Sequence, residues 1–240
     1  MTRSGRTTTL AVLAGLLLLG CGGGGPKAAD TAADEGTRPE QEPADDGAQV
    51  QGLLGNIPTH EVERVFERGL PKLSECYGLA LDISDAISGS LEFAVVVRGD
   101  GEVGEVFLRS SDLGSVEAEE CMVDAVARFR FPRPRGGDRA ELTWSMAVDP
   151  PGGRAVVVTW DESRLAAAIE EHREEVDRCL AGAIGVRLTI YIGPGGRVLS
   201  AGGSSGGAES AAGVRCLARA AATWILLDPG RDTAKAVVPF

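Results

Sequence analysis

The chain has 240 residues and a formal net charge of −11, and 43% of its residues are hydrophobic. This length and composition are typical of one large or two small globular domains. The acidic charge argues against sequence-independent binding of nucleic acid, which requires a basic surface to hold phosphates.

The N-terminal segment has the features of an export signal. Arg3 and Arg6 precede an apolar run at residues 10–19, which is too short to cross the roughly 30 Å hydrocarbon layer of a bilayer. The run ends in Leu-Leu-Gly-Cys, which resembles the bacterial lipobox and implies cleavage after Gly20 and lipid attachment at Cys21. We therefore expect residues 1–20 to be a lipoprotein signal peptide; the alternative is an ordinary secretory signal with an accidental cysteine.

The resemblance to lipoproteins also implies a location. The mature chain would be anchored by its lipid in the bacterial envelope and would face the periplasm. Gly22, instead of an aspartate, follows the cysteine, which favours the outer membrane. Residues 21–55 are rich in glycine, alanine and acidic side chains, so they predict a disordered tether that extends by charge repulsion.

A first domain is predicted at residues 56–150. Apolar residues recur at helical spacing after Thr59, a plausible N-cap, and Pro71 predicts a kink or a second helical segment. Alternating apolar residues at 91–98 predict a strand, and Gly-Asp-Gly at 99–101 predicts a turn into a partner strand at 103–108. A second helix at 116–130, whose first turns are rich in glutamate, and a third strand at 142–148 complete the order α-β-β-α-β.

The same order recurs in residues 151–240, which we predict to be a second, divergent copy. An offset of 103 residues aligns Cys76 with Cys179, and an offset of 95 aligns the first strand, Gly101 and Cys121 with their counterparts. In this second copy, the counterpart of the first helix runs from Leu165 to Cys179. Residues 155–160 predict an additional strand.

Four cysteines remain once Cys21 is set aside, and they allow three pairings. The duplication selects Cys76 with Cys121 and Cys179 with Cys216, so that one disulfide joins the two helices of each copy. An oxidising compartment outside the cytoplasm suits such bonds. The alternative is a redox or metal pair, but the chain has no Cys-x-x-Cys motif and His60 and His172 lack ligand spacing.

The run LPKLSECY, the Gly-Asp-Gly hairpin, residues 116–121 and the run FRFPRPRGG followed by a strand resemble the AgmX/PglI C-terminal family, a TonB C-terminal-like group. Residues 57–148 carry this resemblance well, and the second copy carries a degenerate form of it. The resemblance implies an α+β fold of two tandem modules, each with two helices on a three-stranded antiparallel sheet. It also implies binding of envelope proteins, often by addition of a partner strand to a sheet edge.

Candidate site residues are few. Five arginines cluster in the acidic chain and could dock an anionic partner or pair with nearby acids: Arg128, Arg130, Arg133, Arg135 and Arg139. The glycine-serine run at residues 202–207 lacks the context of a phosphate-binding loop, so we expect a flexible loop. Tyr77 is expected in the core, and the spacing of His60, Ser110 and Ser111 does not support a catalytic triad.

These observations predict a non-catalytic envelope lipoprotein that binds or scaffolds periplasmic or outer-membrane proteins, in a transport or gliding-motility assembly. No cofactor, metal or small-molecule substrate is inferred. The chain lacks a helix that could couple it to a proton-driven motor, so energy transduction by this protein alone is not expected. Two alternatives stay open: a periplasmic enzyme or thiol-redox protein, and a cell-wall-binding module.

Overall fold

The computed structural model describes residues 54–153, 155–160 and 162–240. The predicted signal peptide, Cys21 and nearly all of the predicted tether lie outside these residues. The described residues of both predicted domains belong to one compact unit. The described chain is a mixed α+β fold with a three-stranded antiparallel sheet and a four-stranded mixed sheet.

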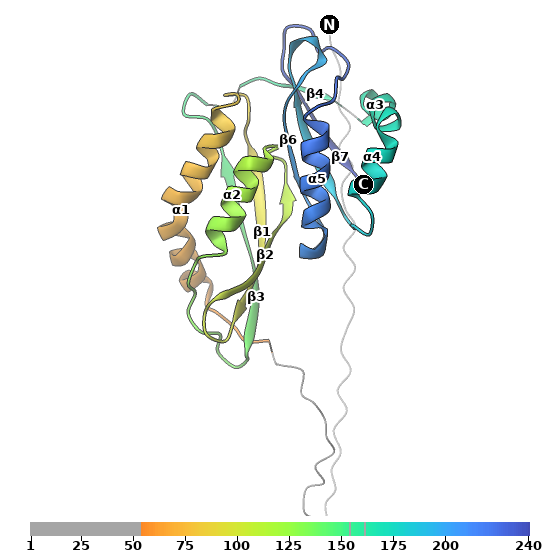
Figure 1. The fold of residues 1–240 in the computed structure, drawn as a ribbon. Helices are drawn as coiled ribbons and strands as arrows, with labels where there is room; N and C mark the ends of the chain where they lie inside the picture. Colours follow the sequence, from red (N-terminus) through yellow and green to blue (C-terminus); the bar gives the residue numbers. More distant parts are fainter. Residues whose placement is uncertain (1–53, 154, 161) are drawn as a thin grey trace, which may run out of the picture. The chain divides into compact units, whose positions relative to one another are not determined.

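The first module comprises the elements from α1 to β3, in the predicted order α-β-β-α-β. Its elements are α1 (Thr59–Leu81), β1 (Gly89–Arg98), β2 (Val103–Ser111), α2 (Val116–Val126) and β3 (Arg139–Val148). The strands form an antiparallel sheet in the order β2-β1-β3. Both helices cover one face of this sheet (Figure 1).

The core of the first module lies between these helices and the sheet. Phe66 of α1 is fully buried and stacks on Trp144 of β3, with ring centroids 4.0 Å apart. A disulfide joins Cys76 of α1 to Cys121 of α2 across a Cα–Cα distance of 5.5 Å, as the sequence predicts. Tyr77 lies in this core, also as predicted, and donates a hydrogen bond to the carbonyl of Ile87.

The second module comprises the elements from β4 to β7. Its strands are β4 (Val158–Trp160), β5 (Arg187–Ile192), β6 (Val198–Ser204) and β7 (Ala234–Pro239), and its α-helices are α3 (Ala166–Glu171), α4 (Arg173–Cys179) and α5 (Ala211–Ala221). Three short 3-10 helices lie between them: η1 (Glu162–Arg164), η2 (Pro194–Gly196) and η3 (Ala208–Ser210). The second predicted disulfide, Cys179–Cys216, joins α4 to α5.

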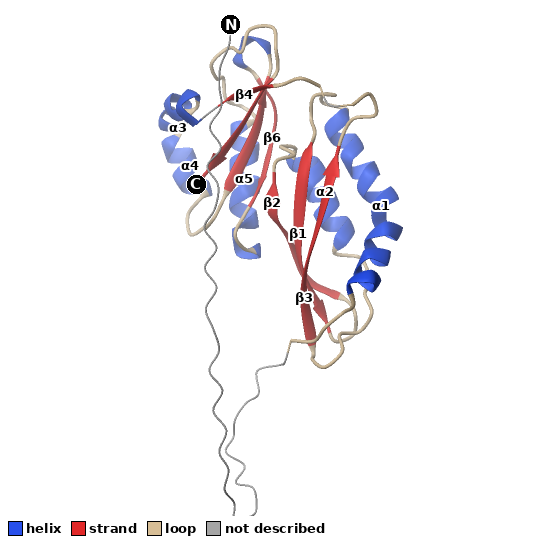
Figure 2. Cartoon of the chain, turned by 180° about the vertical axis from the view of Figure 1, so that it is seen from behind, coloured by secondary structure: helices blue, strands red, loops and turns tan. Residues whose placement is uncertain are grey.

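The second sheet differs from the expected three-stranded antiparallel one. Its order is β4-β7-β5-β6, and β4 pairs with β7 in parallel. The two edge strands, β4 and β6, are labelled in Figure 2. The first module has a shorter parallel pairing at the same place, where Leu54 forms a bridge to Arg139 at the start of β3. In each module, a short segment before the first helix therefore pairs in parallel with the last strand.

Three helix predictions are wrong in detail. Helix α1 passes through Pro71 without a break. Proline has no N–H to donate to the carbonyl of Glu67, but both residues are exposed, so water can hydrogen-bond to that carbonyl. Helix α2 ends at Val126 instead of Arg130, since Phe131 donates its backbone N–H to Gly101 of the hairpin. The single helix expected in the second module is divided at His172, whose ring stacks on Trp224.

The hairpin contacts recur at the offset of 95 residues. The N–H of Phe131 donates to the carbonyl of Gly101 at 2.9 Å, and the N–H of Leu226 donates to that of Gly196 at 2.8 Å. Both glycines have positive φ, and a Cβ on either would collide with the carbonyl oxygen opposite it. Equivalent backbone contacts at equivalent positions support a duplicated unit.

We expect the double substitution Cys76→Ala with Cys121→Ala to destabilise the folded chain. Loss of a link that closes 45 residues lowers the free energy of unfolding by about 4 kcal/mol on the chain-entropy estimate. Urea unfolding of the oxidised protein measures this change. Unfolding midpoints equal to the parent's would contradict a stabilising role for the disulfide.

Candidate functional site

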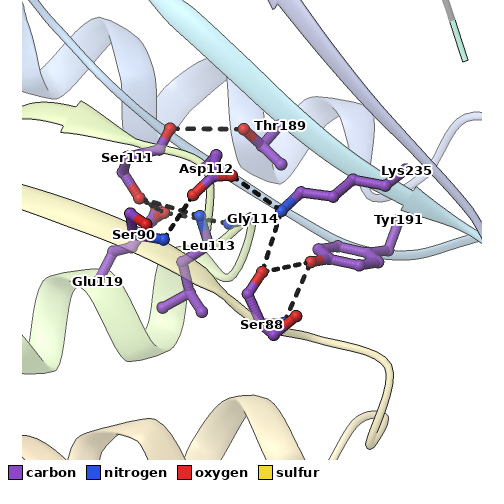
Figure 3. Close-up of polar contacts among 10 residues, drawn as sticks. All are labelled: Ser88, Ser90, Ser111, Asp112, Leu113, Gly114, Glu119, Thr189, Tyr191 and Lys235. Carbon is purple, nitrogen blue, oxygen red and sulfur yellow. Dashed lines mark hydrogen bonds and ion pairs between the residues drawn. The ribbon is translucent and has the colours of Figure 1, made fainter. Parts of the chain in front are cut away.

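The two modules meet at a seam where β2, the loop before β1 and the start of α2 face β5 and β6. The sheets remain separate, and the N–H of Ser205, just after β6, donates to the carbonyl of Leu108 in β2 at 3.1 Å. Several other contacts in the seam use polar side chains, which Figure 3 shows converging from both modules. This seam is the most developed polar site in the described chain.

Tyr191 of β5 crosses the seam and belongs to the hydrophobic core of the first module. Its ring is fully buried, and its hydroxyl donates to the carbonyl of Ser88 at 2.7 Å and accepts the N–H of the same residue at 3.1 Å. Both backbone groups of a buried loop residue are therefore satisfied by one side chain from the other module. The first module is incomplete without this ring.

Lys235 of β7 adds a charged contact beside Tyr191. Its ammonium donates to the carbonyl of Ser88 at 3.0 Å and pairs with Asp112 at 3.2 Å (Figure 3). Asp112 in turn accepts the N–H of Ser90 at 2.5 Å. The Lys235 side chain is 15% exposed, so this pair is less screened by solvent than an ordinary surface ion pair.

Glu119 of α2 occupies the other end of the seam. One carboxyl oxygen accepts the hydroxyl of Ser111 at 2.6 Å and the N–H of Gly114 at 3.2 Å, both from the first module. The other oxygen accepts the N–H of Gly203, from the second module, at 2.7 Å. Since donors of both modules engage its oxygens, the carboxyl acts as a link between the modules.

Burial raises the pKa of Glu119 from its ordinary value of 4.5 to about 7, although the hydrogen bonds from Ser111, Gly203 and Gly114 act in the opposite direction.

The residue also lines a groove of about 430 Å³ between the modules. Other groove residues come from β2, α2, β6 and α5, among them Val106, Val123, Val214 and Arg215. The groove is open to solvent beside the Glu119 carboxyl and gives protons a path to this group.

The glycine-serine run at 202–207 is not the flexible loop that the sequence predicts. Gly202, Gly203 and Ser204 belong to β6 and are buried. A Cβ on Gly202 would collide with the Glu119 carboxylate, and one on Gly203 would collide with the backbone of Arg187. At Gly202, the absence of a side chain lets α2 of the first module approach β6 closely.

The five predicted arginines lie in the segment from the end of α2 to the start of β3. Three of them pair within the first module: Arg130 with Glu102, Arg135 with Glu61 at 3.0 Å, and Arg139 with Glu141 at 3.4 Å. These arginine side chains stay largely exposed, so the pairs contribute little stability. Pairing with nearby acids, one of the two interpretations from the sequence, therefore holds for these three residues.

The structure does not bring the other candidate residues together. His60 is exposed at the start of α1, whereas Ser111, at the end of β2, donates to Glu119. The four cysteines of residues 54–240 form the two disulfides. In the described ranges, no group of three or more His, Cys, Asp or Glu side chains is arranged to hold a metal ion.

Sequence reasoning missed the seam. Glu119 stood among the glutamates at the start of a helix, but it also occupies an apolar face, three residues after Val116 and three before Met122. Tyr191 alternates with the inward-facing residues of its strand, so it belongs to the opposite face of the sheet. Two features of the sequence could have indicated these buried residues: an acidic residue on the apolar face of a helix, for Glu119, and a strand that is apolar on both faces, for Tyr191.

The comparisons with known proteins return no relatives: no protein family, curated protein or solved structure matches the chain. Within the part of the chain that the structure describes, no helix is long and apolar enough to cross a membrane. The two disulfides are typical of a protein that resides in an oxidising, extracytoplasmic compartment.

We expect Tyr191→Phe to lower the free energy of unfolding by about 1–3 kcal/mol, because the buried N–H and carbonyl of Ser88 lose hydrogen-bonding partners. Chemical denaturation measures the change. Thr143→Val, which removes a hydroxyl from an exposed strand position, serves as the control and should change stability by less than about 0.5 kcal/mol. Equal effects of the two substitutions would count against the importance of the Tyr191 hydroxyl.

We expect Gly202→Ala to destabilise the protein by about 1–3 kcal/mol, because the new methyl group collides with Glu119 across the seam. Gly78→Ala is the matched control, since a Cβ there meets no neighbour within 4 Å and alanine favours the helix. Thermal unfolding of the two variants compares them directly. A Gly202→Ala protein as stable as Gly78→Ala would show that the seam has room for a methyl group.

Proposed function

We propose that this protein is a non-catalytic envelope lipoprotein whose TonB C-terminal-like modules bind partner proteins, and that the first module takes an extended partner segment at the outer edge of β3. The observation that carries the proposal is the unshared edge of this ten-residue strand. In the sheet order β2-β1-β3, the opposite edge, β2, faces the second module. Among the described strands of this sheet, β3 therefore has the accessible edge.

The register of β3 identifies its outward-facing backbone groups. The carbonyl of Arg139 accepts the N–H of Gly55, on the side away from β1. Because strand residues alternate, the backbone N–H and C=O groups of every second residue face the same way: Glu141, Thr143, Ser145 and Ala147. Such a row is a template for an added strand.

Side chains beside this edge offer an apolar surface to an incoming strand. Leu142, Trp144 and Met146 alternate on the helix-facing side of β3 and are half-buried. Leu70 of α1 is 39% exposed and lies one helical turn after Phe66, which stacks on Trp144. A partner segment with apolar residues at alternate positions would cover these side chains.

The second module supplies a precedent for strand addition at this position. At the offset of 95 residues, β7 is the counterpart of β3, and β4 pairs with its outer edge from Val158 to Trp160. The counterpart of β4 in the first module is reduced to the bridge between Leu54 and Arg139. The rest of the β3 edge is thus left for another chain.

The lipid anchor and envelope location belong to the same proposal. The lipobox-like sequence ending at Cys21 would hold the modules at the periplasmic face of a membrane, with the outer membrane favoured. The predicted tether, residues 21–55, would give the modules reach toward a partner. Two disulfides in the folded part agree with an extracytoplasmic setting.

Site-specific photocrosslinking in intact cells tests the β3 edge. A photoreactive residue replaces Ser145, and the same residue at Arg178, which is 71% exposed on α4, serves as the control position. We expect a defined crosslinked protein from position 145 and none from position 178. Equal labelling from both positions would contradict a specific edge.

A second substitution then tests strand addition. Thr143→Pro removes one outward N–H but leaves the β1 ladder intact, and Thr143→Val keeps that N–H. Loss of one backbone hydrogen bond, about 1 kcal/mol, should reduce crosslinking from position 145 about fivefold in the proline variant alone. Cooperative unfolding of each variant confirms that the module is folded; undiminished crosslinking in folded Thr143→Pro would refute strand addition.

A further inference from the structure

Glu119 is a buried acid that links two modules without a cationic partner. Its side chain is 4% exposed, and its three hydrogen-bond donors, from Ser111, Gly114 and Gly203, are all neutral groups. Within residues 54–153, 155–160 and 162–240, no lysine, arginine or histidine lies within ion-pair distance of it. A carboxylate in such a place costs desolvation energy that no opposite charge offsets.

The charged groups of the neighbouring elements do not change this balance. They are Glu117, Glu120 and Asp124 on α2, Glu105 and Arg109 on β2, Asp112 after β2, Arg187 on β5, Glu209 on η3, Arg215 and Arg219 on α5, and Lys235 on β7. Both α5 arginines pair with Glu120, at 3.3 and 2.8 Å. Lys235 pairs with Asp112, while the negative charge of Glu117 disfavours ionisation of Glu119 further.

We propose that Glu119 makes the seam proton-responsive: the two modules are held most tightly while its carboxyl is neutral, and ionisation loosens the seam. The reason is thermodynamic linkage. When the seam opens, the carboxyl enters water, where the ionised form is well solvated. The closed seam therefore binds the proton more tightly than the open one, and proton binding must favour closure.

The direction and range of the pH effect follow. The folded pKa of about 7 lies above the ordinary value of 4.5, so the closed state keeps its full advantage below pH 4.5 and loses it as the pH rises to about 7. Above that value both states are ionised, and the equilibrium changes no further. The closed-to-open ratio should fall by at most ~300-fold over this range, because each pKa difference of one corresponds to a factor of ten.

Opening of the seam would have a structural consequence distinct from binding at β3. It would separate the carbonyl of Leu108 from the N–H of Ser205 and expose the edges of β2 and β6. It would also withdraw Tyr191 from the first core. The groove beside Glu119 gives protons access to the carboxyl in the closed state, so the response needs no prior unfolding.

Distance measurements between spin labels test the proposal on the whole folded chain. Labels on Lys72→Cys in α1 and Arg178→Cys in α4 report the separation of the modules, and both positions are exposed. The four cysteines of the two modules are held in disulfides and do not compete for label. Between pH 5 and pH 9 we expect the distance distribution to gain a longer, broader population.

Three variants assign the response to one carboxyl. Glu119→Gln should abolish the pH dependence, and Glu117→Gln, an exposed neighbour on the same helix, should retain it. Ser111→Ala removes a hydrogen bond that lowers the pKa of Glu119 and should move the transition to higher pH. The proposal fails if the parent distribution is the same at every pH, if folded Glu119→Gln still responds, or if Ser111→Ala leaves the transition unmoved.

Discussion

The insertion of Tyr191 into the core of the first module is the contact on which the arrangement of the described chain depends. The ring is fully buried among residues of the other module, and its hydroxyl satisfies both backbone groups of Ser88. A fully buried aromatic side chain contributes far more than a surface contact. The two modules therefore share a core, and the second one supports the first.

The two modules differ at the residues that form this shared core. At the offset of 95 residues, Tyr191 replaces Val96, and Gly202 and Gly203 replace the bulky pair Phe107 and Leu108. The loss of those side chains opens β6 to the approach of Glu119, whose own counterpart in the second copy is Val214. The seam thus joins two unlike surfaces, and its polar contacts specify one arrangement.

The seam also determines which sheet edges remain accessible. It covers the edges of β2 and β6, while β4 covers part of the outer edge of β7. Among the described strands, the outer edges of β4, which has three residues, and of β3, which has ten, remain unpaired, and half-buried apolar side chains line the β3 edge. The predicted arginine cluster lies near the start of this strand, and its partial pairing with acids makes it a weaker candidate for recognition.

The sequence by itself determined the order of elements in each module, the turn glycines and both disulfides, because these depend on local periodicity, on backbone conformation and on the correspondence between repeats. It misjudged the glycine-serine run and missed Glu119 and Tyr191, whose roles arise from contacts with residues 84 and 103 positions away. Only the tertiary structure decided those roles. Local patterns could mark Glu119 and Tyr191 as buried, but their partners depend on how the two folded modules pack against each other.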